Sequence, residues 1–424
     1  MVSLPVAGAL IALVPSTALQ MVLLLGAGTI VAAALLARRG RVLDAAWVIV
    51  MELYLIGPAG SLLRAVGISL VLTPLAALAA TPFVAAALWI RRTAREVLVL
   101  ATPLLALWAF AALSLAWSPD PASGADKIVL SVFTGLGPAL CILVLAGGGR
   151  RVSWGLVAGV AFCEALGLIA FGTASAAYPG RPTLFDANPI WSARGIFLGT
   201  LVATFAVLPR LARATAVPVM VVAGLLTVSL GPFLGLLAGG WAGVGEALHC
   251  RPGRSLPLVV GWVVLGLAIA AIAIMAVSGA IEPASPLLAR VLDDPNATSR
   301  GTYLGASLDM FLRAPLIGAG AGGFAAGGLD AYPHNLVAEI GSELGLVGLI
   351  PLAAWLWLAV RGAAGSPLLV ALVVGTCVYT LGSGSLASNA EFWMITAAAA
   401  SRVPLVSAGR VPATVAAVAS PVGP

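Results

Sequence analysis

Charged side chains are scarce in this sequence, and so are histidine and cysteine. Only 9% of the 424 residues are charged and 61% are hydrophobic, whereas about a quarter of the residues of an average soluble domain are charged. Apolar runs of about 20 residues, long enough to cross about 30 Å of hydrocarbon as a helix, recur along the chain. The scarcity of charge excludes an ordinary soluble domain and predicts an all-α polytopic membrane protein.

The basic residues are too dispersed to form a nucleic-acid-binding surface, although the net charge is +6. They occur in short clusters between apolar runs, where the positive-inside rule assigns them to cytoplasmic loops. These clusters are Arg38, Arg39 and Arg41; Arg91, Arg92 and Arg95; Arg150 and Arg151; Arg210 and Arg213; Arg251 and Arg254. The outer side then receives Asp120, Asp126, Asp186, Asp293, Asp294 and Asp330. We expect the lipid bilayer as a partner, and no nucleic acid.

Patterns typical of metal or nucleotide sites are missing. The four cysteines lack the spacing of a disulfide framework or a zinc site. Asp293 and Asp294 are adjacent and precede a proline, which indicates a turn and not a spaced pair of metal ligands. The glycines Gly318, Gly320 and Gly323 follow a predicted helix and not a strand, so they are no dinucleotide fingerprint. We expect neither a metal site nor a cofactor.

The apolar runs predict about twelve to fourteen transmembrane helices. They lie near 5–15, 17–37, 43–57, 68–90, 97–117, 126–147, 153–172, 191–209, 215–231, 232–248, 257–277, 341–361, 366–383 and 391–404. We expect a transmembrane bundle over 1–277, an outer loop over 278–340 that carries the site, C-terminal transmembrane helices over 341–404, and a cytoplasmic tail over 405–424. A loop as long as the second segment is usually functional or disordered, and its pattern favours function.

Within the long outer loop, residues 299–313 are predicted to form an amphipathic helix along the membrane surface. Its apolar face would combine Tyr303, Leu304, Leu308, Phe311 and Leu312. Its polar residues Arg300, Ser307 and Asp309 would lie away from that face. A turn-rich run over 314–324 follows, and 332–335 opens the next membrane helix. A second outer loop spans 181–194.

The chain has two histidines, His249 and His334. His249 lies beside a basic cytoplasmic cluster and is most simply a solvated loop residue. His334 follows a proline at the outer start of a helix, and histidine is the side chain that exchanges protons near neutral pH. We predict a proton carrier at His334. The alternative interpretation is an interfacial histidine that caps a helix.

Three outer arginines are candidate phosphate ligands, because guanidinium binds phosphate oxygens in a bidentate way and stays charged. Arg300 lies on the amphipathic helix, where the alternative is a side chain that extends to the lipid headgroups. Arg181 and Arg194 flank the second outer loop and oppose the positive-inside trend. Arg194 also begins an apolar run, where an unpaired charge would be costly.

Three glutamates lie in or beside apolar runs. Glu164 is inside the run 153–172, where a carboxylate is a functional candidate by default and a hydrogen bond to a neighbouring helix is the alternative. Glu339 and Glu343 lie one turn apart. They would orient His334 or pair with an arginine, or else they would interact with the dipole of a helix N-terminus.

The order of three short motifs resembles the O-antigen ligase and O-antigen polymerase superfamily. The strongest runs from Ser299-Arg300 through Pro315-Leu316-Ile317-Gly318-Ala319-Gly320, Phe324 and Pro333-His334-Asn335 to Glu343-Leu344-Gly345-Leu346-Val347-Gly348. The second is Asn188-Pro189-Ile190-Trp191-Ser192-Ala193-Arg194 after Arg181, and the third is Ser229-Leu230-Gly231-Pro232-Phe233-Leu234-Gly235. In the third, Leu230 stands where the family commonly has an arginine, so one of the usual cations is missing there.

The resemblance implies a membrane glycosyltransferase of the C-type fold, with its site on the periplasmic or extracellular face of the bacterial plasma membrane. Such a protein transfers a glycan from undecaprenyl diphosphate to an acceptor glycolipid or glycan, inverts the anomeric centre and needs no metal. Arg300 and His334 would form the central pair, with His334 as general base or diphosphate ligand. Arg181, Arg194 and Asn188 would bind the donor diphosphate. Asn335, Glu339 and Glu343 would support the site.

Three other functions stay open at this point. A polymerase of lipid-linked repeats would use the same donor with a different acceptor. A flippase would need polar residues through the membrane midplane and usually an internal repeat, and the sequence shows little of either. A peptidoglycan polymerase of the shape-and-division family would share a related architecture, but the histidine-asparagine motif argues against it.

Overall fold

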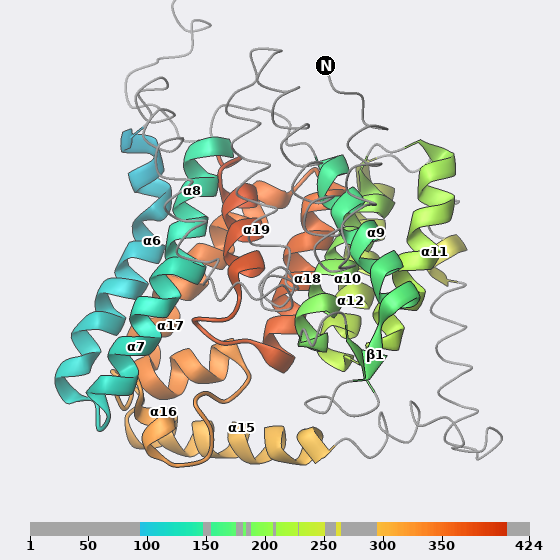
Figure 1. Cartoon of the computed structure of the whole chain (residues 1–424). Coiled ribbons are helices and arrows are strands. Elements are labelled where there is room, and N and C mark those ends of the chain that lie inside the picture. The colour runs from blue at the N-terminus through green and yellow to red at the C-terminus, as the bar shows by residue number, and fades with distance from the viewer. Residues whose placement is uncertain are drawn as a thin grey trace, which may run out of the picture.

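The computed structural model describes residues 94–146, 154–174, 181–183, 188–206, 209–227, 229–250, 260–263 and 295–404 (Figure 1). Several predicted segments lie outside these residues. They are the four spans before residue 91, most of the span 257–277, the loop around Asp186, the pair Asp293-Asp294, and the tail 405–424.

The described residues fold into helices, apart from one short antiparallel strand pair. The helices are α6 (Ala94–Leu113), η1 (Ser114–Trp117), α7 (Pro121–Ser131), the π-helical turn η2 (Val132–Leu136), α8 (Gly137–Ala146), α9 (Trp154–Phe171), α10 (Pro189–Phe205), α11 (Arg210–Leu226), α12 (Leu230–Cys250), α15 (Pro295–Arg313), α16 (Gly323–Ala326), α17 (Leu336–Ala363), α18 (Pro367–Ser383) and α19 (Ala390–Ala400). The strands β1 (Thr173–Ala174) and β2 (Pro182–Thr183) pair with Thr173 opposite Thr183.

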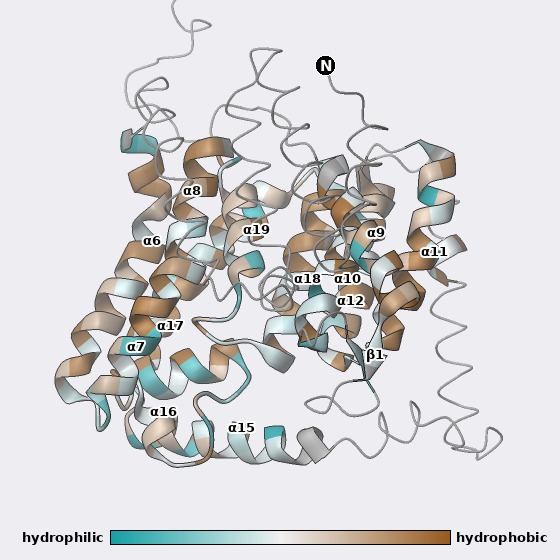
Figure 2. Cartoon of the chain, in the orientation of Figure 1, coloured by the Kyte–Doolittle hydropathy of each residue, from teal (hydrophilic) through white to brown (hydrophobic). Residues whose placement is uncertain are grey.

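Several of the described helices are apolar, and some have the length and composition of membrane spans. Among the described residues, three apolar stretches are long enough to cross a bilayer: Arg95–Trp117, Pro121–Leu145 and Leu336–Ala363. Shorter apolar helices lie at Val157–Phe171, Leu211–Leu226 and Pro367–Ser383. Figure 2 shows hydrophobic residues along the upright helices and a paler α15. The all-helical architecture is consistent with the predicted polytopic membrane protein, and each predicted span within the described residues coincides with a helix.

Helix α15 lies crosswise under one end of the bundle (Figure 1). The predicted helix over 299–313 is confirmed and begins four residues earlier, at Pro295. Its leucines Leu304, Leu308 and Leu312 are 51%, 55% and 65% exposed, as expected of a helix at a membrane surface. Ser307, which was expected away from the apolar face, is buried. Its hydroxyl donates to the Tyr303 carbonyl at 2.8 Å, which satisfies the buried polar group within the helix.

Basic residues gather at the end of the bundle away from α15. The C-terminal end of α6 lies near α15, because Ser118, just after η1, donates to the carbonyl of Ala321 in the segment that follows α15. Arg95, in the first turn of α6, therefore lies at the far end. Arg361 lies in the last turn of α17, which starts at the α15 end. Arg402 follows the far end of α19. Arg300 and Arg313 lie on α15 itself, so the predicted orientation in the membrane stays a prediction.

The glycine segment, which we define as Pro315–Phe324, fills a break in α17. Helix α17 has a non-helical Gly345 with φ of 62° and ψ of −158°. The Leu346 and Val347 amides donate to the carbonyls of Pro315 and Leu316, at 2.9 and 3.0 Å. The Gly320 amide donates in turn to the Glu343 carbonyl at 2.8 Å. The break is therefore repaired by backbone hydrogen bonds to another segment, which leaves few polar groups unpaired.

We predict that Gly345→Ala destabilises the protein by more than about 2 kcal/mol, because a left-handed backbone alone costs an L residue roughly 1–2 kcal/mol. A Cβ at this position would also lie 2.5 Å from the Leu316 backbone. Thermal unfolding in detergent measures the effect. Gly305→Ala is the matched control, since nothing lies within 4 Å of a Cβ there. An equal melting temperature for both variants would contradict this explanation of the break.

Candidate functional site

His334 lies in a cluster of aromatic and acidic side chains between α15 and α17. Its Nε2 is 3.1 Å from a carboxylate oxygen of Asp330. Its ring stacks on Tyr303 of α15 at 5.9 Å between centroids, with an interplanar angle of 23°. The ring of Tyr332 lies on it at 4.5 Å. We call Tyr303, Asp330, Tyr332 and His334 the histidine cluster.

The backbone of His334 is held in an uncommon conformation. Its φ is +58°, the only positive value among the described non-glycine residues, and such residues are sparse and concentrate at functional sites. The His334 carbonyl accepts from the Gly384 amide at 3.2 Å. Asn335 follows as the N-cap of α17, because its side-chain oxygen accepts from the Ala338 amide at 3.0 Å. Its side-chain nitrogen donates to the Leu381 carbonyl at 2.9 Å.

Arg300 lies on α15, the helix that contributes Tyr303 to the histidine cluster. It is half-buried and lies three residues before Tyr303, whose ring stacks on His334. Side chains three residues apart on a helix are neighbours. The two residues expected to form the central pair are therefore brought to the same end of the bundle.

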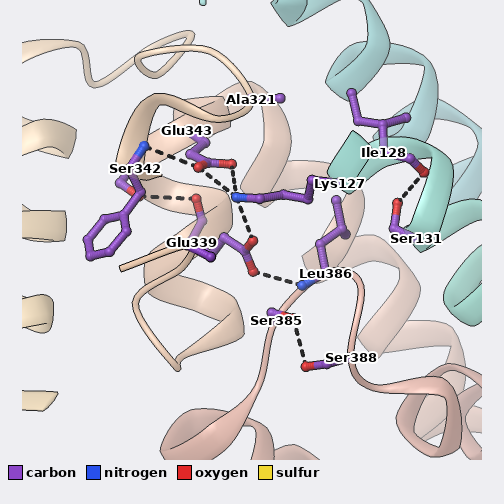
Figure 3. A network of polar contacts seen from close by, with 12 residues as sticks. Lys127, Ile128, Ser131, Ala321, Glu339, Ser342, Glu343, Ser385, Leu386 and Ser388 are labelled. Atoms are coloured by element: carbon purple, nitrogen blue, oxygen red, sulfur yellow. Dashed lines mark hydrogen bonds and ion pairs between the residues drawn. The ribbon is translucent and has the colours of Figure 1, made fainter. Parts of the chain in front are cut away.

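A buried ion-pair network lies beside the histidine cluster (Figure 3). The Lys127 ammonium is 3.0 Å from a Glu339 oxygen and 2.8 Å from a Glu343 oxygen. The second Glu339 oxygen accepts from the Leu386 amide at 2.7 Å. Glu343 also accepts from the Phe324 amide at 3.2 Å. We call Lys127, Glu339 and Glu343 the charge cluster.

The charge cluster corrects one expectation about the two glutamates, because their cationic partner is a lysine of α7 and not an arginine. All three charged groups are nearly buried, with side chains 11%, 2% and 4% exposed for Lys127, Glu339 and Glu343. A buried charge is tolerated when it is paired and hydrogen-bonded. The charge cluster meets this requirement and ties α7, α17 and the glycine segment together.

The connection between α18 and α19, residues 384–389, lies between the charge cluster and the histidine cluster. Glu339 binds its Leu386 amide, and the His334 carbonyl binds its Gly384 amide. From α10, an Arg194 nitrogen donates to the Ser388 carbonyl at 2.7 Å. We call this connection the α18–α19 loop. Its fixed conformation depends on three of the residues that the sequence singled out.

Arg194 is enclosed within the bundle and has several protein partners. Its guanidinium forms an ion pair with Glu391 at 3.0 Å and donates to both the carbonyl and the hydroxyl of Ser383. It also lies 5.0 Å from the centre of the Tyr379 ring. The cost of an unpaired charge at this position is avoided by these contacts.

The remaining sequence candidates lie on neighbouring elements. Asn188 is the N-cap of α10, and its side-chain oxygen accepts from the Ile190 amide at 2.9 Å. Arg181 is half-buried, directly before β2. Within the part of the chain that the structure describes, no hydrogen bond, ion pair or ring contact joins either residue to His334. Glu164 is buried in α9, and its Oε1 has no hydrogen-bond partner among the described residues.

The loop residue Tyr332 lies between the histidine cluster and the α18–α19 loop. Its hydroxyl lies near Ser388 of that loop. Burial raises the pKa of the Tyr332 phenol, while the positive charge of Arg194 acts in the opposite direction. The phenol is therefore a neutral hydrogen-bonding group at the edge of the histidine cluster.

Sequence reasoning missed Lys127, Asp330 and Tyr303 as members of these clusters. Lys127 had a signal, because it is the only lysine in a chain whose other basic residues are all arginine. Asp330 lies four residues before His334, but that spacing is informative only once the loop conformation is known. Groups of three or more potential metal ligands are not found among the described residues.

The fold and these clusters describe a polytopic membrane protein with a polar site at one end of its helical bundle. Residues 215–353 match the family model described as O-antigen ligase. The chain therefore contains an O-antigen ligase domain, which spans about a third of its length. The match includes Arg300, Asp330, His334 and both glutamates of the charge cluster. No curated protein matches the chain.

We predict that Lys127→Met destabilises the protein by about 3–5 kcal/mol, because breaking a buried ion pair leaves an uncompensated buried charge. Chemical unfolding in mixed micelles measures the loss. The triple variant Lys127→Met, Glu339→Gln, Glu343→Gln removes every charge of the cluster and should regain most of the stability. Asp126→Asn is the matched control at an exposed neighbour. A single variant as stable as this control would show that the charge cluster does not hold the helices.

Proposed function

We propose that this protein transfers a glycan from an undecaprenyl diphosphate-linked donor to an acceptor sugar on the outer face of the bacterial plasma membrane. The single observation that carries the proposal is the match to the O-antigen ligase family over residues 215–353, a stretch that includes both His334 and Arg300. Membrane-embedded transfer of a lipid-linked glycan is the activity expected of that family. The full chain would cross the membrane about twelve to fourteen times.

The proposed reaction is a single displacement at the anomeric carbon. The acceptor hydroxyl oxygen attacks this carbon and forms the new glycosidic bond. The bond from the anomeric carbon to the diphosphate oxygen breaks, and its electron pair leaves with undecaprenyl diphosphate. His334 takes the proton of the hydroxyl as general base. One displacement from the opposite side inverts the anomeric configuration, and no metal takes part.

Arg300 would stabilise the leaving diphosphate, because a guanidinium beside developing negative charge lowers the barrier most when it is fixed in advance. Arg181 and Asn188 would extend this cationic surface at the start of α10. Arg194 would serve the donor indirectly, since both terminal nitrogens already donate to the α18–α19 loop, Ser383 or Glu391. In this role Arg194 fixes the α18–α19 loop, against which the donor binds.

The outer face is supported by the distribution of charge. The basic helix ends lie opposite α15, as the positive-inside rule expects of the cytoplasmic side. The site at the α15 end then faces outward. The exposed leucines of α15 would contact the outer leaflet beside the site, where a polyprenyl chain approaches from the side.

Two acceptor classes fit this site, a lipid-anchored core oligosaccharide and a second lipid-linked repeat unit. The first makes the protein a ligase and the second a polymerase. A flippase for the lipid-linked glycan is the less favoured alternative. Its one supporting observation is Glu164, a buried carboxyl group within a membrane helix.

We predict that His334→Ala lowers glycan transfer by at least about 10²-fold, because a positioned general base contributes about 10²–10⁴-fold. Arg300→Ala should lower it comparably. Transfer from a synthetic undecaprenyl diphosphate oligosaccharide in proteoliposomes, without added metal, measures both. Matched controls are His249→Ala, in an exposed last turn of α12, and Arg313→Ala, in the exposed last turn of α15. Normal transfer by a folded His334→Ala variant would refute the role of His334.

A further inference from the structure

We propose that Asp330 is a positioning residue that fixes which nitrogen of His334 accepts the proton of the acceptor hydroxyl. This inference rests on the proposed function and extends it to a residue outside the sequence candidates. It starts from the 3.1 Å contact between the Asp330 carboxylate and Nε2 of His334. An ionised carboxylate only accepts hydrogen bonds, so Nε2 must carry the hydrogen of the neutral ring. The lone pair is then on Nδ1.

The ring of His334 has little freedom to turn away from Asp330. Tyr303 stacks on it from α15 and Tyr332 packs on it from the loop. Its backbone is fixed by the bond from Gly384 to the His334 carbonyl and by the Asn335 cap that follows. Aromatic packing and backbone bonds thus set the plane of the ring, and Asp330 sets the tautomer within that plane.

The chemistry that follows is a proton transfer to Nδ1. As the acceptor oxygen bonds to the anomeric carbon, its proton moves to Nδ1 and the ring becomes an imidazolium. The positive ring is then adjacent to the Asp330 carboxylate, which stabilises it without taking up the proton. This is the arrangement by which a carboxylate orients and supports a histidine base.

The contact between Asp330 and His334 also distinguishes the two roles left open for His334, general base and diphosphate ligand. A histidine that only bound diphosphate would work best as a cation without a nearby anion. Asp330 places a negative charge at the ring, which would repel the diphosphate and weaken such binding. The geometry therefore favours the general base.

Several charged or titratable groups face this part of the molecule. Asp330 and Tyr332 come from the same loop, and Tyr303 and Arg300 come from α15. Arg194 of α10 and Glu339 of α17 act on the Tyr332 hydroxyl in opposite directions. Among them, Asp330 is the group in direct polar contact with the imidazole. Its removal should therefore have the largest effect on the proton equilibrium of His334.

The first test reads the tautomer without any activity. The chain has only two histidines, so ¹⁵N-histidine labelling of a His249→Gln background leaves the signals of His334 alone. We expect a neutral ring protonated at Nε2. With Asp330→Asn added, we expect a mixture of tautomers, because an amide either donates or accepts. The control Asp309→Asn, an exposed residue of α15, should retain the original tautomer. An unchanged tautomer in the Asp330→Asn protein would overturn the inference.

The second test is the pH profile of kcat/KM for glycan transfer. Asp330→Asn should lower transfer by about 10²-fold or more and shift the acidic limb to lower pH, since the imidazolium loses its stabilising anion. Asp330→Glu should restore part of the rate and return the acidic limb of the pH profile toward its wild-type position. A lower rate with an unmoved limb would indicate a structural role only and would overturn the inference.

The two tests also separate this inference from the proposed function. No transfer by the wild-type protein would count against the proposed function and would leave the tautomer measurement to decide the contact with Asp330. Transfer by wild type, loss in His334→Ala and wild-type behaviour of Asp330→Asn in both tests would overturn only the role of Asp330.

Discussion

Three charged side chains buried at the end of an apolar bundle place the strongest constraint on this structure. The Lys127 ammonium lies within 3.0 Å of a carboxylate oxygen of both Glu339 and Glu343, and all three side chains are nearly buried. Such a cluster gives little net stability compared with apolar packing, but it strongly penalises any arrangement that separates its members. Because Lys127 comes from α7 and both glutamates from α17, the cluster fixes how these helices meet. The charge cluster therefore specifies the arrangement of these helices more than it adds to the free energy of unfolding.

The conformation of the candidate site depends on the charge cluster. The second oxygen of Glu339 binds the Leu386 amide of the α18–α19 loop, and Glu343 binds the Phe324 amide of the glycine segment in addition to Lys127. The α18–α19 loop contacts the His334 carbonyl in turn, and Arg194 holds the same loop from α10. The position of His334 therefore depends on Glu339 and Arg194, which act through the α18–α19 loop. Positioning of this kind supports catalysis because a small displacement of a base costs a large factor in rate.

The helices and the amphipathic α15 were predictable from the sequence, because hydrophobic length and periodicity are local properties. His334, Arg300 and the two glutamates were also identifiable, from their rarity in an apolar chain and their order in the motifs. The partners of these residues were not predictable. Lys127 is more than two hundred residues from Glu343 along the chain, and no local sequence pattern predicts that these two residues pair. Arg194 was expected at the donor, but its side chain is enclosed by Ser383, Ser388 and Glu391. The exposed leucines and buried Ser307 show the same limit within one helix, since neighbouring elements decide which face is covered.

The most direct measurement is the fate of a donor labelled in both its glycan and its lipid, supplied to proteoliposomes that contain the wild-type protein and a core oligosaccharide or lipid-linked acceptor. Transfer predicts that the glycan label appears on the acceptor with inverted anomeric configuration, while undecaprenyl diphosphate is released in equal amount. The acceptor that becomes labelled then assigns the protein as a ligase or a polymerase. A donor that crosses the bilayer with its glycosidic bond intact, and is cleaved with neither acceptor, would contradict glycan transfer and indicate a flippase.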